Sequence, residues 1–261
     1  MKDGIARCLV VLSVASFAAC SVKEDRSACP SECEVFFCGP DQLTGKDLEF
    51  GVWNSRSVLH DSFEYEGPMQ KRMYYVPRSP LVFFAGTCRA GTSAEYRIAE
   101  GSQCDSLYTV SRAVRPYGEF CSDTLVLHKD FATVNLSVET AEPGWTDGYH
   151  LRIMGNTAAY SLKDAEPVAG TFRFMPRFNA DACATFRVPR QVDDSLVLEL
   201  LDAGSEEVAL SFGIGMMLKD KGYSWQSRDL EDIDIRLSLD SKDVHLDTLP
   251  WYDGGVLDIS F

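Results

Sequence analysis

The sequence predicts an all-β protein made of two consecutive β-sandwiches. From residue 33 onward, short apolar or alternating runs are separated by clusters of Gly, Pro, Asp and Ser, the pattern of strands joined by turns. Glycine and proline fall between such runs at 67–68, 143–144 and 253–255. Apolar residues make up 45% of the 261 residues, which is enough for a sizeable core, and the length suits two modest domains as readily as one large one.

The first half of the chain contains enough strand-like runs for one sandwich. We expect strands at 34–37, 48–53, 72–76, 81–85, 94–98, 107–110 and 125–128. Seven short strands of this kind are typical of a two-sheet sandwich.

The second half repeats the pattern. We expect strands at 133–138, 149–154, 171–175, 184–188, 196–201, 208–212, 233–239, 244–246 and 256–261. In the run 233–239, Ile233, Ile235 and Leu237 share one face and polar residues share the other, as in a strand with one buried face. The long connection at 216–232 is expected to hold one helical turn, at 218–221.

The N-terminus has the pattern of a lipoprotein signal peptide. Lys2 and Arg7 provide a weak positive charge, residues 8–19 form an apolar run, and small residues directly precede Cys20. A run of about a dozen residues is too short to cross about 30 Å of hydrocarbon as a helix. We therefore expect Cys20 to become the lipid-modified mature N-terminus. The alternative is an ordinary secretory signal that is cleaved at another position.

A short charged segment follows Cys20 and has no apolar periodicity. Within it, Lys23, Glu24 and Asp25 resemble the export signal that displays some lipoproteins on the outer face of the outer membrane. The expected organisation is a signal peptide at 1–19, a lipidated cysteine and tether at 20–32, and sandwiches at 33–129 and 130–261.

Charge and motif content argue against nucleic-acid binding and give no support for catalysis. The 39 acidic and 25 basic residues give a formal charge of -14, which repels phosphate backbones. The four histidines are scattered, and no nucleophile elbow, Walker loop or dinucleotide fingerprint occurs. Adjacent carboxylates such as Asp193 and Asp194 would point to opposite faces of a strand, so they could not act on one bond. We expect no enzymatic activity and no cofactor.

Seven cysteines remain beyond the signal peptide and Cys20. In an oxidising compartment an odd count leaves at least one thiol unpaired, and the sequence does not fix the pairing. Cys29, Cys33 and Cys38 lie close together beside the tether, but their spacing fits neither a zinc ribbon nor an iron–sulfur run. We expect no metal site.

The run 20–30 resembles the mature N-terminus of the anchor-subunit family of type V pili, the fimbrillin-related lipoproteins that hold these fimbriae to the outer membrane. In that family the lipid cysteine is followed by Glu-Asp-Arg-Ser, here 24–27, and then by Cys-Pro-Cys. This chain departs from the motif, because the cysteine after Cys29 and Pro30 comes only at Cys33. A possible Cys29–Cys33 disulfide is implied by this motif alone. Weaker similarity covers 81–86, 223–225, 229–233 and 251–261.

The resemblance implies two transthyretin-like, Greek-key sandwiches, the first near the membrane. It implies an outer-membrane location at the base of a fimbrium, exposed at the cell surface, with fimbrial pilin subunits as partners in cell adhesion. A subunit could dock by adding a strand to an open sheet edge, where backbone donors and acceptors are unpaired. Candidate edges are 233–239 and 256–261, although both could equally be interior or ordinary edge strands.

A second hypothesis from another class is a surface lipoprotein that binds a glycan or a host ligand. Trp53, Trp145 or Trp251 could stack on sugar rings if they were exposed in a row. Buried positions would argue against it. A hydrolase would need a pocket where carboxylates and a histidine converge, and the sequence shows none.

Overall fold

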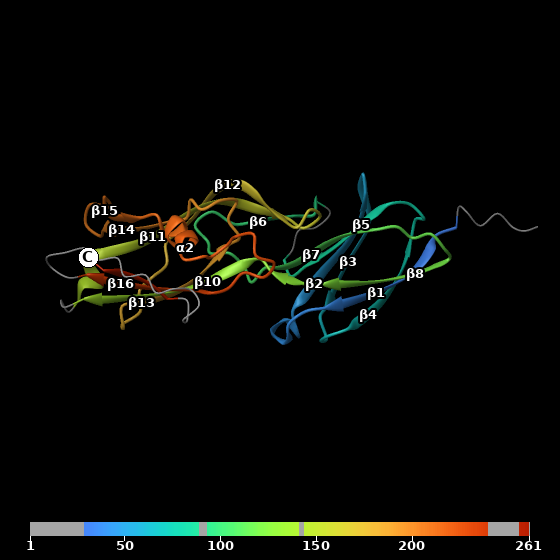
Figure 1. The fold of residues 1–261 in the computed structure, drawn as a ribbon, viewed down its shortest axis with the longest axis horizontal. Helices are drawn as coiled ribbons and strands as arrows, with labels where there is room; N and C mark the ends of the chain where they lie inside the picture. The colour runs from blue at the N-terminus through green and yellow to red at the C-terminus, as the bar shows by residue number, and fades with distance from the viewer. Residues whose placement is uncertain (1–28, 89–92, 141–143, 240–255, 261) are drawn as a thin grey trace, which may run out of the picture.

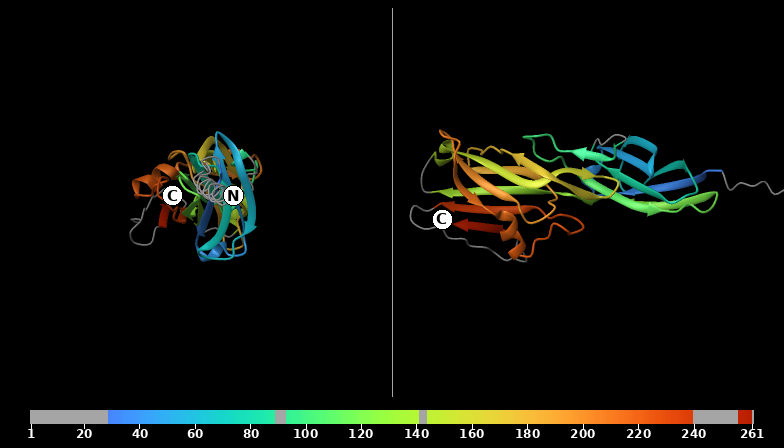
Figure 2. Two further views of the ribbon diagram at one scale, coloured as in Figure 1. Left: turned by 90° about the vertical axis from the view of Figure 1, so that its right-hand side faces the viewer. Right: turned by 90° about the horizontal axis from the view of Figure 1, so that it is seen from above.

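The computed structural model describes residues 29–88, 93–140, 144–239 and 256–260. This part of the chain is nearly all β, which confirms the predicted fold class. Its strands form two sandwiches that lie end to end (Figures 1 and 2). None of the described helices is long and apolar enough to cross a membrane.

Two sheets face each other in the first sandwich. The smaller has the order β4 (Gln70–Val76), β1 (Ser31–Cys38), β8 (Phe120–Val126). The larger has the order β3 (Arg56–Glu64), β2 (Asp47–Asn54), β5 (Leu81–Gly86), β7 (Tyr108–Val114), β9 (His128–Lys129). A 3-10 turn, η2 (Asp41–Leu43), links β1 to β2. Strand β1 alternates strictly between buried and half-buried residues, because its odd-numbered side chains fill the space between the sheets.

Aromatic rings fill much of this first core. The ring of Phe50 meets the rings of Phe37 and Phe83 edge to face, with centroids 5.3 and 5.6 Å away. Such edge-to-face pairs are favourable because the positive ring edge meets the negative ring face. The two sheets are thus joined by packing that spans β1, β2 and β5.

The second sandwich also has two sheets. One has the order β13 (Cys183–Pro189), β10 (Phe131–Thr140), β16 (Ile233–Leu239), β17 (Val256–Ser260). The other has the order β12 (Glu166–Phe174), β11 (Tyr149–Ser161), β14 (Val197–Asp202), β15 (Val208–Phe212). The 3-10 turn η4 (Trp145–Gly148) precedes β11, and the helix α2 (Ile214–Asp220) follows β15. Trp225, Phe172 and Phe186 are the largest fully or almost fully buried side chains of this core.

The two sandwiches share elements where they meet. The short strand β6 (Glu95–Arg97), which comes from the first half of the chain, pairs with β11 of the second sandwich. In return, Tyr160 of β11 and Leu162 pack into the first hydrophobic cluster. The hydrophobic clusters themselves divide between Phe131 and Ala132. The expected domain boundary between residues 129 and 130 stays a prediction. Residues on either side of it take part in contacts of the other sandwich.

Most expected strands are present, but several elements differ from the expectation. Strand β3 was not expected, because its exposed edge position leaves a mostly polar run with no clear alternation. The run 125–128 is split between β8 and β9, and β1 begins at Ser31, inside the expected tether. The expected helical turn is the longer helix α2. The expected strand 244–246 lies outside the described residues.

Candidate functional site: the cleft between the sandwiches

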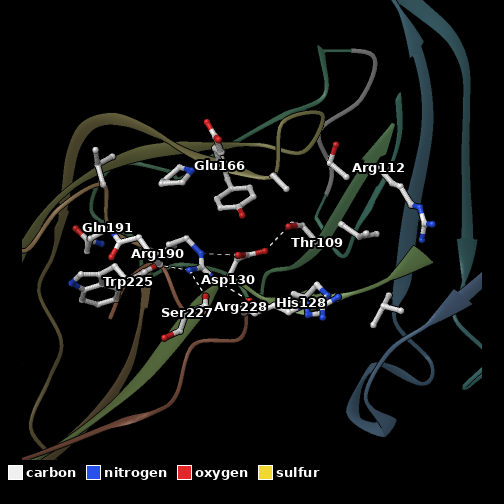
Figure 3. A pocket seen from close by; sticks show the side chains of 18 of the residues that line it. Thr109, Arg112, His128, Asp130, Glu166, Arg190, Gln191, Trp225, Ser227 and Arg228 are labelled. Carbon is white, nitrogen blue, oxygen red and sulfur yellow. Dashed lines mark hydrogen bonds and ion pairs between the residues drawn. The ribbon is translucent and has the colours of Figure 1, made fainter. Parts of the chain in front are cut away.

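A cleft of about 650 Å³ lies where the two sandwiches meet (Figure 3). The first sandwich contributes residues of β7 and β8 to its lining, and the second contributes residues of β11 and β12 and of two loops, 190–192 and 225–228. Junctions between domains are common sites for ligand pockets. The cleft is therefore the first place to look for chemistry in the described part of the chain.

A buried ion pair forms the floor of this cleft. Asp130 stands between β9 and β10, and its Oδ1 accepts a hydrogen bond from Nε of Arg190 at 2.8 Å. Both side chains are at least nine-tenths buried. Arg190 directly follows β13 and Asp130 directly precedes β10, so both charges stand at the end of the second sandwich that meets the first.

The other donors of Arg190 also have partners. Its terminal nitrogens donate to the backbone carbonyls of Trp225, Ser227, Arg228 and Lys129. A buried guanidinium is tolerated only when its N–H groups are hydrogen-bonded and its charge is compensated. Arg190 thereby fixes the loop 225–228 against the start of β10, and it has no spare donor for a ligand.

Two hydroxyl groups complete the environment of Asp130. Its carboxylate accepts a hydrogen bond from the Thr109 hydroxyl of β7, and Tyr160 of β11 is a further hydrogen-bond partner. Burial raises the pKa of Asp130, while the Arg190 guanidinium and the two hydroxyls oppose that rise. Burial also raises the pKa of Tyr160, so its phenol stays a neutral donor. The polar groups of this cluster satisfy one another's hydrogen bonds. The cluster thereby connects the first sandwich to the second.

A second polar cluster lies at the rim. Nε of Arg228 donates to Nε2 of His128 at 2.8 Å, and Nδ1 of His128 lies 3.0 Å from a carboxylate oxygen of Asp229. Because Arg228 can only donate, Nε2 must accept, and the proton of a neutral imidazole is then on Nδ1, facing Asp229. Burial alone would raise the pKa of Asp229, but the Lys129 amide and His128 lower it below its usual value. His128 is thereby held as a structural link between β9 and the loop at 225–232.

Among the described residues, neither Cys29 nor Cys33, which the sequence singled out, lines the cleft. Cys20, Lys23, Glu24 and Asp25 lie outside the described residues, so their roles stay predictions. Cys29 is an exposed free thiol. Cys33 is also a free thiol, but it is fully buried.

The partner of Cys33 in the structure is Cys121. The two residues are directly opposite in the parallel β1–β8 pair, and their side chains are hydrogen-bonded. A Cys29–Cys33 disulfide therefore stays a prediction. Within the described residues, no three His, Cys, Asp or Glu side chains gather as metal ligands would.

Sequence reasoning missed the cleft because its residues are far apart in the chain. Thr109, Asp130, Tyr160, Arg190 and Trp225 each look unremarkable locally. The local signal was weak: a charged residue at the boundary of an apolar strand, with Asp130 directly before β10 and Arg190 directly after β13.

The tryptophans of the glycan hypothesis form no exposed row in the described part. Trp53 is partly buried against the first core, and Nζ of Lys163 lies 5.6 Å from the centroid of its ring. The Trp145 side chain and Trp251 lie outside the description.

The sheet edges give a different kind of candidate site. Strand β16 is interior, because β10 and β17 pair with it on either side in parallel. Its inward residues Ile233, Ile235 and Leu237 are fully or almost fully buried. Strand β17 is the edge strand of this sheet within the described residues. Of the two strands that we expected at a sheet edge, therefore, only β17, described over 256–260, is an edge strand.

Comparison with known proteins defines the class of fold. No protein-family model and no curated protein sequence matches the chain. Solved structures do match, and they include fimbrial and adhesin β-sandwich proteins from Bacteroides and related bacteria. The fold of the chain is therefore that of fimbrial and adhesin β-sandwich proteins, and the resemblance found in the sequence is confirmed for the fold.

Three solved structures illustrate the likeness. The fimbrial anchor protein Mfa2 from Porphyromonas gingivalis is 12% identical and has a TM-score of 0.62, over 85% of this chain and 93% of that one. A candidate polysaccharide-binding protein from Bacteroides thetaiotaomicron is 14% identical with a TM-score of 0.61, over 80% and 92%. A candidate adhesin from the same organism is 14% identical with a TM-score of 0.56, over 80% and 92%.

Proposed function

We propose that this protein is an outer-membrane lipoprotein that anchors or assembles a fimbria. In this proposal Cys20 carries the lipid, the export signal at Lys23 to Asp25 directs the protein to the cell surface, and a fimbrial subunit docks through a β-strand. The likeness to the fold of a fimbrial anchor protein supports the proposal, as does the N-terminal pattern.

The observation that carries the docking step is the position of β17. It is a five-residue strand, and β16 is its only partner within the described residues. Its other edge can pair with a strand of a subunit, or a subunit strand can replace it on β16. The main-chain bonds would supply affinity, and the buried face of β16 would impose the register.

The anchoring step is tested with Cys20→Ala in intact cells. We expect the variant to leave the membrane fraction and fimbriae to be shed into the medium. If the variant is released while fimbriae stay attached, the fimbrial role is wrong, and the glycan-binding hypothesis takes its place.

The docking step is tested separately at β17, in protein that keeps its lipid. Asp258→Pro removes one backbone N–H from this strand, whereas Asp258→Ala keeps it. We expect the proline variant to lose capture of the fimbrial subunit and the alanine variant to retain it. Equal capture by both variants would place the docking surface elsewhere.

A further inference from the structure

Three exposed aromatic side chains gather at one end of the first sandwich. Tyr75 of β4 and Phe120 of β8 are both in register with Glu32 of β1, so they flank Glu32 on the outer face of the three-stranded sheet. Their exposed fractions are 67% and 57%. Tyr117, in the turn before β8, is 80% exposed. We call Tyr75, Tyr117 and Phe120 the aromatic end.

The other exposed apolar side chains of this face, Met73 and Val126, are not aromatic. Met73 is the next outward residue of β4 and is 42% exposed. Opposite it, Glu34 is in register with Met73, and its carboxylate pairs with the ammonium of Lys71 at 2.7 Å. The large exposed rings are therefore concentrated in the row closest to the start of β1. A cluster of exposed apolar side chains on a folded domain marks a contact surface.

The aromatic end lies where the chain arrives from its N-terminus. Strand β1 begins at Ser31, strand β8 begins at Phe120, and both starts lie at the end away from the second sandwich (Figure 1). Cys20 precedes Ser31 by eleven residues, which span at most about 40 Å when fully extended. A lipid on Cys20 would thus hold this end within reach of the bilayer surface.

We infer that the aromatic end is a membrane-contact surface, with Tyr75, Tyr117 and Phe120 in the headgroup layer of the bilayer that holds the lipid of Cys20. This inference rests on the proposed lipid attachment and goes beyond it, because a lipid alone does not determine the orientation of the sandwich relative to the bilayer. Aromatic rings with a polar tip suit a boundary where one side is apolar and the other is wet.

The expected depth of contact is shallow. Glu32 lies between the two rings, and the Arg115 side chain is hydrogen-bonded to Tyr117. Charged groups are costly in hydrocarbon but tolerated among headgroups. A few aromatic rings bind a bilayer weakly by themselves, but a short tether gives them a high effective concentration at its surface.

Oxidative footprinting of lipid-modified protein tests the inference. The protein is reconstituted on vesicles of phosphatidylethanolamine and phosphatidylglycerol, and unlipidated Cys20→Ala protein in solution is the reference. We expect oxidation of Tyr75, Tyr117 and Phe120, and of Met73 on the same face, to slow severalfold on vesicles. Met175 and Met216, exposed residues of the second sandwich, serve as internal controls that keep their solution rates.

A variant links the protection to the rings themselves. Tyr75→Ser, Tyr117→Ser and Phe120→Ser are combined in lipidated protein, and Met73 remains as a reporter on the same face. We expect the variant to stay on vesicles while Met73 regains its solution rate of oxidation. The matched control, Met175→Ser with Met216→Ser, should leave the protection of Met73 unchanged.

The outcomes separate this inference from the proposed anchor. If the protein binds vesicles but its three rings are not protected from oxidation, the membrane contact is wrong and the lipid anchor still stands. Failure of the wild-type protein to bind vesicles overturns both. If soluble protein is protected at the same rings by a purified pilin or by a polysaccharide, and vesicles give no protection, the surface belongs to that partner and the inference is wrong.

Discussion

Nε of Arg190 and Oδ1 of Asp130 lie 2.8 Å apart at the junction of the two sandwiches, and both side chains are buried. Asp130 directly precedes β10, and Arg190 directly follows β13, its antiparallel neighbour. The pair therefore connects one end of the β10–β13 strand pair to the loop 225–228, which lines the cleft.

Removing one member of this pair should be strongly destabilising. Arg190→Met leaves the Asp130 carboxylate buried without its charge partner, and we expect a loss of about 3–5 kcal/mol in the free energy of unfolding. Urea denaturation followed by tryptophan fluorescence measures it.

The matched control is an ion pair at the surface. Nζ of Lys219 lies 2.7 Å from Asp194, and the lysine side chain is mostly exposed. Lys219→Ala should leave the free energy of unfolding almost unchanged, because solvent screens an exposed ion pair. A similar loss for Lys219→Ala and Arg190→Met would contradict the role of the buried pair.

Acid should weaken the link between β9, β10 and the loop before β16. Asp232 accepts hydrogen bonds from the Lys129 ammonium at 2.6 Å and the Thr133 amide at 2.7 Å. Burial alone would raise the pKa of Asp232, but these partners lower it below its usual value. Its stabilisation is therefore complete above the pKa of the unfolded chain and is lost as the pH falls through the lower pKa of the folded protein.

The measurement compares wild-type protein with Asp232→Asn from pH 7 to pH 2. Because the carboxylate is half exposed, we expect a difference of less than about 1 kcal/mol at pH 7, and it should shrink below about pH 4. A difference that does not change with pH would show that the ionised carboxylate is not responsible.

Thiol labelling of reduced native protein should divide the cysteines by burial. Cys29 is exposed, whereas Cys33, Cys88 and Cys104 are buried. Burial raises the pKa of the three buried thiols, and the reactive thiolate is correspondingly scarce. We expect maleimide to modify Cys29 within minutes and the buried thiols only after denaturation, as read by peptide mass spectrometry. Rapid labelling of Cys33 would mean that β1 is not packed as described.

A methyl group added at Gly51 should disturb the first core. Gly51 is buried in β2, and an added Cβ would lie 2.1 Å from the ring of Phe84 on β5. We expect Gly51→Ala to cost about 1–3 kcal/mol of unfolding free energy through overpacking. Gly213→Ala is the control, since no atom lies within 4 Å of its added Cβ. Equal midpoints of thermal unfolding for the two variants would refute the expected clash.

The sequence alone determined the features that depend on local periodicity. A strand buries every second residue, so the alternation at 233–239 identified β16, and the turn residues separated most other strands. Strand β3 was not predicted, because a strand exposed at a sheet edge needs no apolar alternation. The expectations for Cys20 and its neighbours also come from the sequence alone.

Only the tertiary structure decided which segments meet. Alternation along β16 does not reveal that β10 and β17 flank it, and no local pattern predicts that Cys33 faces Cys121. The junction of the two sandwiches requires Asp130 and Arg190, sixty residues apart in the sequence, to share one buried site. Pairing and burial of this kind are set by the free energy of the whole packed chain, so they become visible only when the two sandwiches are assembled.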